Sequence, residues 1–229
     1  MNTIFKDQYG PTETFTERQV KRFLKAIQNN RYEPLLKLIM TYQISRAELI
    51  SLEWEDVDFD NNTITLYPIS TIRNEKTFYA WEMTKLTEYK RTLPLLPSIK
   101  NLLIELKNKQ QINSTKNPNF DFLNENFVCL KNDGTRMNIN TLSRNLRYVA
   151  RDNNLPQILL SGLKLSLDNV ICKLARDYDF YRAWTRYDCK ALSPKNIYKH
   201  FILHNKRFIN ALDDFISCNK MHSKSDMEM

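Results

Sequence analysis

Three arginines recur at a spacing that would place them on one face of a helix. Arg144, Arg147 and Arg151 are separated by three and four residues, which matches the helical repeat. Guanidinium groups aligned in this way suit phosphate oxygens, which they can contact through paired N–H donors. The chemistry that these arginines predict is contact with a nucleic-acid backbone, with a solvated basic face as the ordinary alternative.

A second basic group lies close to the C-terminus. Lys190, Lys195 and Lys199 surround Tyr198, and His200 follows directly. The whole chain carries a formal net charge of +8, which favours a polyanionic partner. The charge alone therefore favours a nucleic acid as the partner.

Several other chemistries are disfavoured by what the chain lacks. Only three glycines are present, too few and too scattered for a phosphate-binding loop, so no nucleotide cofactor is expected. His200 and His204 stand one helical turn apart, but the third histidine, His222, lies near the chain end, so no metal site is expected. The four cysteines are widely spaced without a CxxC pair, which indicates reduced thiols.

The apolar segments are short. None approaches the roughly 18 residues that a membrane span requires, and the first ten residues lack the apolar run of a signal peptide. The expected location is therefore the cytoplasm of a bacterium or of a phage host.

Most of the chain shows helical signals. Ser45 and Glu48 form a capping-box pattern, as do Thr16 and Gln19, and Pro34 fits a first helical turn. Further helices are expected at 47–52, 99–107 and 140–151, with helical segments continuing to about residue 219.

A few segments read as strands or loops. The expected strands are Thr63–Tyr67, Thr77–Thr84 and Lys90–Leu95, with a further short strand at Phe127–Leu130. The polar stretch Asn108–Asn119 reads as a loop. The fold class is thus mainly α with a small three-stranded antiparallel sheet. One domain is expected over residues 15–219, between an N-terminal tail at 1–14 and a disordered C-terminal tail at 220–229.

The last helical segment has an apolar face made by Phe208, Ile209, Leu212 and Phe215. Two interpretations stay open. The helix packs on its own core, or it docks on a second copy of the chain and makes a homo-oligomer.

Four stretches, in this order, resemble the catalytic domain of the tyrosine recombinase (phage integrase) family. Residues 41–59 resemble the segment TGLRxxELLxLxWxDIDF, and residues 84–95 resemble the hairpin TKTxxSxRTIPL. Residues 127–155 are similar to the segment that leads into the motif HxLRH, and residues 193–200 to the terminal TxxxYxH. The resemblance runs from about residue 14 to about residue 212 and implies the family's fold.

The resemblance also implies a chemistry, which is transesterification at a DNA phosphate. Tyr198 matches the tyrosine that attacks the phosphorus, and Lys85 matches the hairpin lysine that protonates the leaving oxygen. From its residue type alone, Tyr198 would be a packing residue on a helix face, and Lys85 a solvated hairpin charge. Two arginines and a histidine-type donor complete the family's site.

The remaining catalytic positions depart from the family pattern. Ser45 stands where the first arginine is expected, and Arg46, one residue later, is rotated by roughly 100° on a helix. The HxLRH motif aligns with Ser161 and Lys164 in place of its first histidine and its arginine. Asp188 takes the position of a histidine or tryptophan. Cleavage should therefore be negligible, whereas phosphate binding depends on summed positive charge, which the chain keeps.

The partner that the resemblance implies is double-stranded DNA, and cations along the chain are assigned to its path by charge and by the resemblance. They are Arg46, Lys85, Lys90, Arg91, Arg144, Arg147, Arg151, Lys164, Lys190, Lys195, Lys199 and His200.

The leading hypothesis is a DNA-binding protein that derives from a tyrosine recombinase and has lost strand exchange. By analogy, its most concrete form is a transcriptional repressor of a phage or mobile element. One alternative is an active recombinase with an atypical site that uses Arg46, Lys85, Arg182 or Arg186, and Tyr198. Another is an interaction subunit that binds a recombinase and does not need DNA.

Overall fold

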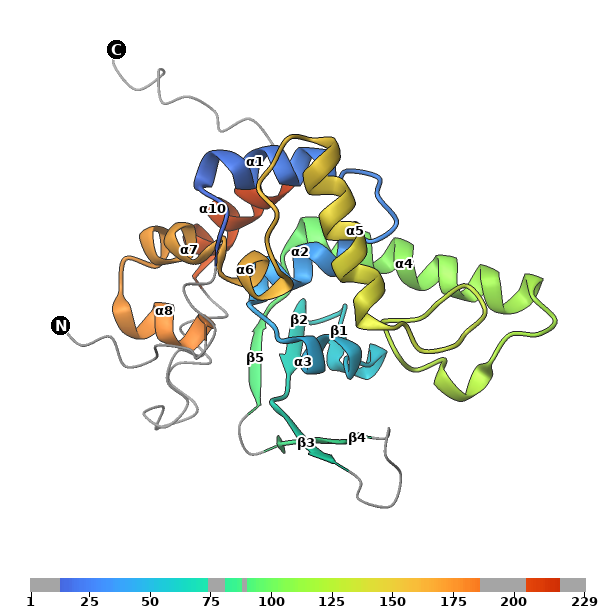
Figure 1. Ribbon diagram of the computed structural model, residues 1–229. Helices are drawn as coiled ribbons and strands as arrows, with labels where there is room; N and C mark the ends of the chain where they lie inside the picture. The colour runs from blue at the N-terminus through green and yellow to red at the C-terminus, as the bar shows by residue number, and fades with distance from the viewer. Residues whose placement is uncertain (1–12, 74–80, 88–89, 186–204, 219–229) are drawn as a thin grey trace, which may run out of the picture.

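The computed structural model describes residues 13–73, 81–87, 90–185 and 205–218 (Figure 1). Its α-helices, in chain order, are α1 (Glu17–Ala26), α2 (Glu33–Tyr42), α3 (Arg46–Ile50), α4 (Pro97–Lys116), α5 (Ile139–Asp152), α6 (Leu160–Leu165), α7 (Asp168–Ala175), α8 (Tyr178–Thr185) and α10 (Lys206–Ser217). The strands are β1 (Val57–Asp58), β2 (Thr63–Leu66), β3 (Ile69–Arg73), β4 (Trp81–Lys85) and β5 (Arg91–Pro94). The short 3₁₀ helices are η1 (Trp54–Asp56) and η3 (Phe122–Asn124). The predicted mainly α fold with a small sheet is confirmed.

Both predicted capping boxes are present. The Thr16 hydroxyl accepts from the Gln19 amide, while the Gln19 side chain accepts from the Thr16 amide. Ser45 and Glu48 make the same reciprocal pair at the start of α3. In each case two backbone N–H groups that the helix itself leaves unpaired are satisfied locally, which fixes where the helix begins.

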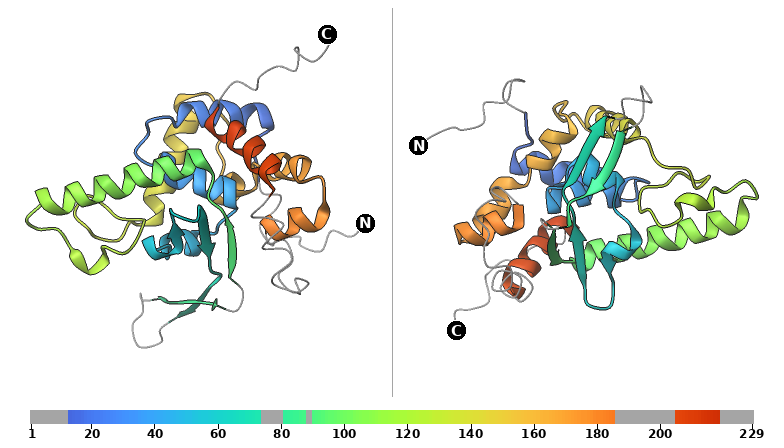
Figure 2. Two further views of the ribbon diagram at one scale, coloured as in Figure 1. Left: turned by 180° about the vertical axis from the view of Figure 1, so that it is seen from behind. Right: turned by 90° about the horizontal axis from the view of Figure 1, so that it is seen from below.

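Helix α2 runs through the centre of the molecule. All ten of its residues are buried, and it contacts α4 and α6, which lie on opposite sides of it (Figure 2). Pro34 occupies its first turn, as predicted. The charges on α2 are paired with each other, because Lys37 Nζ lies 2.8 Å from Glu33 Oε1 and both side chains are buried. A buried charge is tolerable only with such a partner.

The three-stranded sheet has the antiparallel order β1-β2-β5, with Ile64 of β2 opposite Leu93 of β5. The strands predicted around Thr63 and Arg91 are thus confirmed. Residues 77–80 of the strand predicted at Thr77–Thr84 lie outside the described residues, and the rest falls in β4, which pairs with β3 in a separate two-stranded ladder and does not join the three-stranded sheet. That ladder projects below the helices in Figure 1. The sequence did not predict β3, because Pro68 interrupts the apolar alternation just after β2.

The loop predicted at Asn108–Asn119 is wrong, because α4 continues to Lys116. Its second half is polar but rich in lysine and glutamine, which favour helix on a solvent-exposed face. Gln110 also ties it to the domain: its Oε1 accepts from the Trp54 indole at 2.9 Å, and its Nε2 donates to the Val128 carbonyl at 2.8 Å. The helix ends before Pro118, which disfavours the helical conformation of its predecessor.

The strand predicted at Phe127–Leu130 is also wrong. The segment makes only two isolated bridges, Glu53 with Phe127 and Leu130 with Arg136. The reason is the turn at Asp133–Gly134, which reverses the chain so soon that no ladder can extend. Gly134 has φ +80°, and a Cβ there would lie 2.4 Å from the Asp121 carbonyl oxygen, so only glycine fits.

The apolar face of α10 packs on its own chain. Phe208, Leu212 and Phe215 are buried, and Phe208 makes edge contacts with Phe180 and Trp184. The structure therefore favours the first of the two interpretations, in which this helix completes the core. The predicted tails at 1–14 and 220–229 fall almost entirely outside the described residues. Among the helices that the structure describes, none is long and apolar enough to cross a bilayer.

Candidate nucleic-acid interface

Ser45 is the N-cap of α3, and both its hydroxyl and its amide are engaged in capping the helix. Its Oγ accepts from the Glu48 amide at 3.2 Å, and its own amide donates to Glu48 Oε2 at 2.7 Å. Arg46 follows as the first residue of α3 and is exposed. Whether Arg46 takes over the role of the missing arginine stays a prediction.

Sequence reasoning missed the role of Gln43, which precedes this helix. Its backbone is left-handed, with φ +49°, and its buried amide donates from Nε2 to Asp168 Oδ1 at 3.0 Å. Asp168 Oδ1 also accepts from the Tyr181 hydroxyl at 2.7 Å. The signal was present, because Gln43 aligns with the glycine of TGLR, and a left-handed residue is usually glycine. The network joins the end of α2 to α7 and α8.

Lys85, at the end of β4, is held by two carboxylates. Its Nζ lies 2.7 Å from Glu53 Oε2 and 2.9 Å from Asp56 Oδ2. Burial by itself lowers the pKa of Lys85, but the hydrogen bonds and charges of Glu53 and Asp56 outweigh burial, so its pKa is raised. The interpretation of Lys85 as a solvated hairpin charge therefore does not hold, and its DNA contact stays a prediction.

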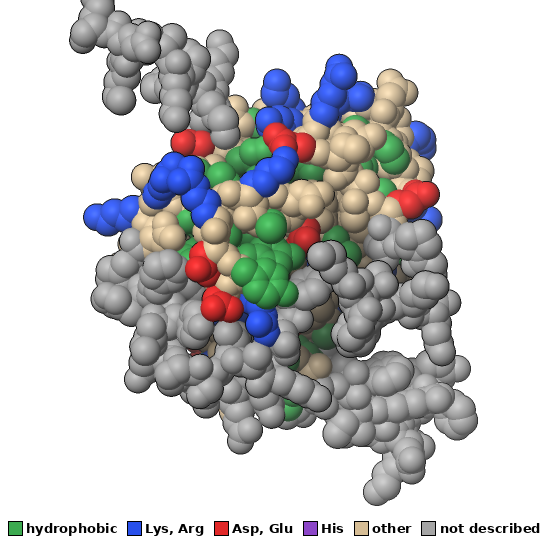
Figure 3. Space-filling view, turned by 90° about the vertical axis from the view of Figure 1, so that its left-hand side faces the viewer, with side chains coloured by type: hydrophobic (Ala, Val, Ile, Leu, Met, Phe, Trp, Pro, Cys, Tyr) green, Lys and Arg blue, Asp and Glu red, His purple; other side chains and the backbone are tan. Residues whose placement is uncertain are grey.

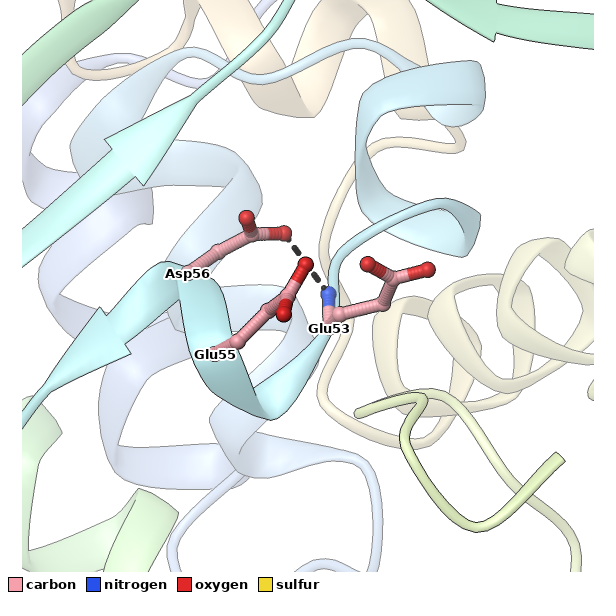
Figure 4. A group of neighbouring side chains, drawn as sticks. All are labelled: Glu53, Glu55 and Asp56. Atoms are coloured by element: carbon pink, nitrogen blue, oxygen red, sulfur yellow. Dashed lines mark hydrogen bonds between the residues drawn. The ribbon is translucent and has the colours of Figure 1, made fainter.

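Glu53, Glu55 and Asp56 gather their carboxylates at this point (Figure 4). Asp56 Oδ2 accepts from the Glu53 amide at 2.9 Å, which fixes the turn of η1. Such a trio resembles a cation site, but the ammonium of Lys85 already supplies the cation for two of its members. Glu55 is exposed, and surface carboxylates are common without a metal.

Arg91, at the start of β5, is also engaged internally. Its guanidinium donates to the carbonyls of Tyr42 and Trp184. These carbonyls belong to the last turns of α2 and α8, where helix carbonyls lack partners and the helix dipole favours a cation. These two bonds give Arg91 a capping role, and its predicted place on the DNA path stays a prediction. Its neighbour Lys90 is exposed.

Helix α5 carries the predicted stripe of arginines. Arg144, Arg147 and Arg151 are exposed, while Leu142 and Leu146 on the opposite side are buried. Arg151 pairs with Asp152 at 2.8 Å, but none of the ion pairs among the described residues includes Arg144 or Arg147.

An aromatic side chain interrupts this stripe. Tyr148 is 53% exposed, and the guanidinium of Arg151 lies 5.2 Å from its ring centroid. An exposed aromatic ring beside guanidinium groups is suited to packing on a sugar or base edge.

Helix α6 carries the two positions aligned with HxLRH. Ser161 is exposed and Lys164 is half-buried. The chain before α1 crosses this helix: the Phe15 amide donates to Ser166 Oγ at 3.0 Å, and a Cβ on Gly162 would lie 2.0 Å from the Glu13 carbonyl oxygen. Gly162 therefore permits a close backbone crossing beside Ser161 and Lys164.

A further basic area lies on the face that includes α7 and α8 (Figure 3). Here Lys and Arg side chains are interleaved with Asp and Glu. Glu17 on α1 pairs with Lys21 at 3.0 Å and with Lys173 at 3.6 Å. This face is more compensated in charge than the α5 stripe. The remaining predicted site residues, which lie outside the described residues, are Asp188, Lys190, Lys195, Tyr198, Lys199 and His200.

Comparisons with known proteins test the fold. No protein-family model matches the chain. A curated relative, the tyrosine recombinase XerC-like protein of Caldanaerobacter subterraneus subsp. tengcongensis, is 26% identical over 106 residues, which cover 43% of this chain and 27% of the relative. The match thus spans about a quarter of that relative.

Solved structures match over more of the chain. The Tn1549 transposon integrase in complex with transposon right end DNA has a TM-score of 0.61 at 16% identity, covering 80% of this chain and 60% of that one. The XerA recombinase has a TM-score of 0.56 at 14% identity, covering 92% and 67%. XerH bound to palindromic difH substrate has a TM-score of 0.55 at 15% identity, covering 86% and 52%.

The fold is that of a tyrosine recombinase catalytic domain. The resemblance given by the sequence motifs is therefore confirmed at the level of fold.

The recombinase-like fold gives the substituted positions a clear meaning. Ser45 aligns with the family's first arginine and instead caps α3. Lys164 keeps a positive charge in place of the second arginine but lacks the planar fork that grips two oxygens. Lys85, which the resemblance matches to the hairpin lysine, is bound by carboxylates.

Proposed function

We propose that this protein binds DNA through a recombinase-like domain and does not exchange strands. The observation that carries the proposal is Ser45. It aligns with the family's first arginine, and its hydroxyl is committed to the Glu48 amide. A hydroxyl used in this way cannot replace two guanidinium donors at a phosphate.

DNA binding is supported by the α5 stripe and by the structural neighbours. Arg144 and Arg147 are exposed without an ion pair among the described residues, and Tyr148 lies between Arg147 and Arg151 on the same surface. The Tn1549 integrase and XerH were both solved with DNA. A net charge of +8 adds a sequence-independent attraction to the backbone.

Loss of catalysis is supported by the summed substitutions. Removing a single preorganised donor from an oxyanion site costs about 10²–10³ in rate. Here Ser45, Ser161 and Lys164 replace three donors, and Asp188 introduces a carboxylate that would repel a phosphate. Even without full additivity, the residual rate is negligible.

A regulatory role follows from binding without cleavage. A domain that occupies a DNA site and leaves it intact is suited to block transcription. Repression in a phage or mobile element is the form that we favour, by analogy with the setting of the Tn1549 transposon integrase.

An active recombinase with an atypical site is the second candidate, because the structural neighbours named above are recombinases. It would require two arginines to converge on one phosphate, Arg46 with either Arg182 or Arg186, the last of which lies outside the described residues. Arg46 is exposed on α3, whereas the Arg182 guanidinium lies 5.5 Å from the Tyr178 ring centroid on α8. A covalent adduct through Tyr198 would distinguish this candidate from the first.

The test of DNA binding is selection from a random duplex library with purified protein, followed by titration of the selected site. We expect a specific complex whose affinity falls with salt at a log–log slope of roughly −4 to −8. Failure to select any sequence, together with a slope near zero, would overturn the proposal. That result would favour the alternative in which the protein is an interaction subunit that binds a recombinase and does not need DNA.

A further inference from the structure

The ammonium of Lys85 sits in a cage built from three side chains. Glu53 comes from just before η1, Asp56 from η1 itself, and Tyr67 from just after β2. Besides its bonds to the two carboxylates, Lys85 Nζ lies 5.1 Å from the Tyr67 ring centroid. An ammonium with two carboxylates and an aromatic face has most of its interactions satisfied inside the protein.

The two carboxylates are not equivalent. The side chain of Asp56 is 4% exposed, and its Oδ2 also accepts from the Glu53 amide, so Asp56 is fixed. The side chain of Glu53 is 23% exposed. Arg136, whose guanidinium stacks on Phe127, also interacts electrostatically with Glu53 and offers it a second cation. Glu53 is therefore the partner that can leave Lys85.

A DNA phosphate that approaches Lys85 has to compete with a carboxylate already in place. Both are anions that accept charge-assisted hydrogen bonds from an ammonium. As long as Glu53 stays, Lys85 contributes little to DNA, and the surrounding carboxylates repel the backbone.

We propose that Glu53 is an internal competitor for Lys85 that weakens DNA binding until a phosphate displaces it. The inference rests on the proposed DNA-binding function and concerns how that site is restrained. DNA sites that bring a phosphate to the β3–β4 hairpin then gain one contact, and sites that do not leave the cage closed. The cage thus lowers the affinity for DNA sites that do not place a phosphate at Lys85.

Glu53→Gln is the decisive variant. It removes one carboxylate charge, while Asp56 still holds the lysine, so folding should be preserved. We expect affinity for the selected duplex to rise roughly threefold to tenfold, and the log–log salt slope to steepen by about one unit as one more phosphate is neutralised.

Glu55→Gln is the matched control. It removes the same charge from the same acidic trio, but none of the ion pairs among the described residues joins its carboxylate to Lys85, and its side chain is exposed. Its salt slope should equal that of the unmodified protein. An equal steepening in both variants would overturn the competitor role, because it would reflect general charge alone.

Lys85→Met, alone and combined with Glu53→Gln, completes a double-mutant cycle. In this background Glu53→Gln should change neither affinity nor slope, because no ammonium is left to be freed. Modification of Lys85 by an amine-acylating reagent, read by mass spectrometry in free protein, gives a readout without DNA. It should be slow in the unmodified protein, faster in Glu53→Gln and unchanged in Glu55→Gln.

The outcomes separate the two proposals. If the unmodified protein binds DNA and Glu53→Gln binds with the same affinity and slope, the competitor role is wrong and the proposed function stands. If acylation of Lys85 is equally fast in the unmodified protein, in Glu53→Gln and in Glu55→Gln, the cage does not hold the lysine in solution, and the inference again fails. If none of the variants binds DNA, both proposals fall.

Discussion

The α5 stripe and the region around Lys85 and Arg91 both carry cations but use them differently. On α5, Arg144 and Arg147 project into solvent, without ion pairs to any described residue. In the second region, Lys85 is bound by Glu53 and Asp56, and Arg91 caps α2 and α8. Positively charged residues therefore have two different roles: some face solvent, and others bond to groups within the protein.

The two groups of cations contribute differently to the folded domain. Cations bonded to carbonyls and carboxylates stabilise its packing. Exposed cations contribute little to stability and are available to contact a partner. The comparison predicts that substitutions in one region change stability, and those in the other change DNA affinity.

The largest effect is expected at Arg91. Arg91→Met should lower the free energy of unfolding by about 3 kcal/mol, since two charge-assisted hydrogen bonds to helix carbonyls are lost. Chemical denaturation measures this loss. Lys90→Met, at an exposed neighbour with the same charge change, should cost less than about 0.5 kcal/mol. A stable Arg91→Met protein with weakened DNA binding would assign Arg91 to the interface instead.

Substitutions on α5 should change DNA affinity and leave stability nearly unchanged. Arg144→Ala and Arg147→Ala should each lower the salt slope by about one unit and weaken binding roughly tenfold at moderate salt. Fluorescence anisotropy titrations at several salt concentrations measure both quantities. Arg18→Ala, which removes an exposed charge from α1, is the control and should leave the slope unchanged. Equal effects from all three would mean that net charge, and not the stripe, governs binding.

A smaller effect is expected at Tyr198. Tyr198→Phe removes one hydroxyl, which in a binding protein is worth at most about 0.5–1.5 kcal/mol, or roughly tenfold in affinity. Binding titrations and a reporter for repression should both remain near the values of the unmodified protein. Loss of biological function with intact affinity would show that the nucleophile is in use.

The smallest effect is a pH dependence of stability at Lys85. Its pKa is raised above the ordinary 10.5 in the folded protein, so its contribution is complete below that pH and is lost as pH rises through the folded pKa. The difference in melting temperature between the unmodified protein and Lys85→Met should thus be constant near neutral pH and shrink above pH 10.5. A difference that does not change with pH would mean that Lys85 contributes by packing alone.

Local signals in the sequence predicted a large part of this structure. The capping boxes at Thr16 and Ser45, the amphipathic α5 and the strands around Ile64 and Leu93 follow from short-range patterns. These patterns succeed because the deciding interactions lie within four residues or alternate along one strand.

The missed features depend on distant residues. The end of α4 is helical partly because Gln110 bonds to Trp54 and Val128, which no local pattern reveals. Arg91 caps two helices that lie far from it in sequence, and Lys85 meets Glu53 across 32 residues. A sequence shows that a residue is charged, but the fold decides whether the charge faces solvent or a partner within the protein.

The central claim is that this domain binds DNA and leaves it uncut. The most direct test is a nicked suicide duplex that carries the selected site, incubated with the protein and analysed on a denaturing gel. Such substrates trap a phosphotyrosine link, because the cleaved strand diffuses away before it can be rejoined. We predict a shifted complex on a native gel and no covalent band on the denaturing gel. A covalent band that disappears in Tyr198→Phe would contradict the account and identify an active recombinase.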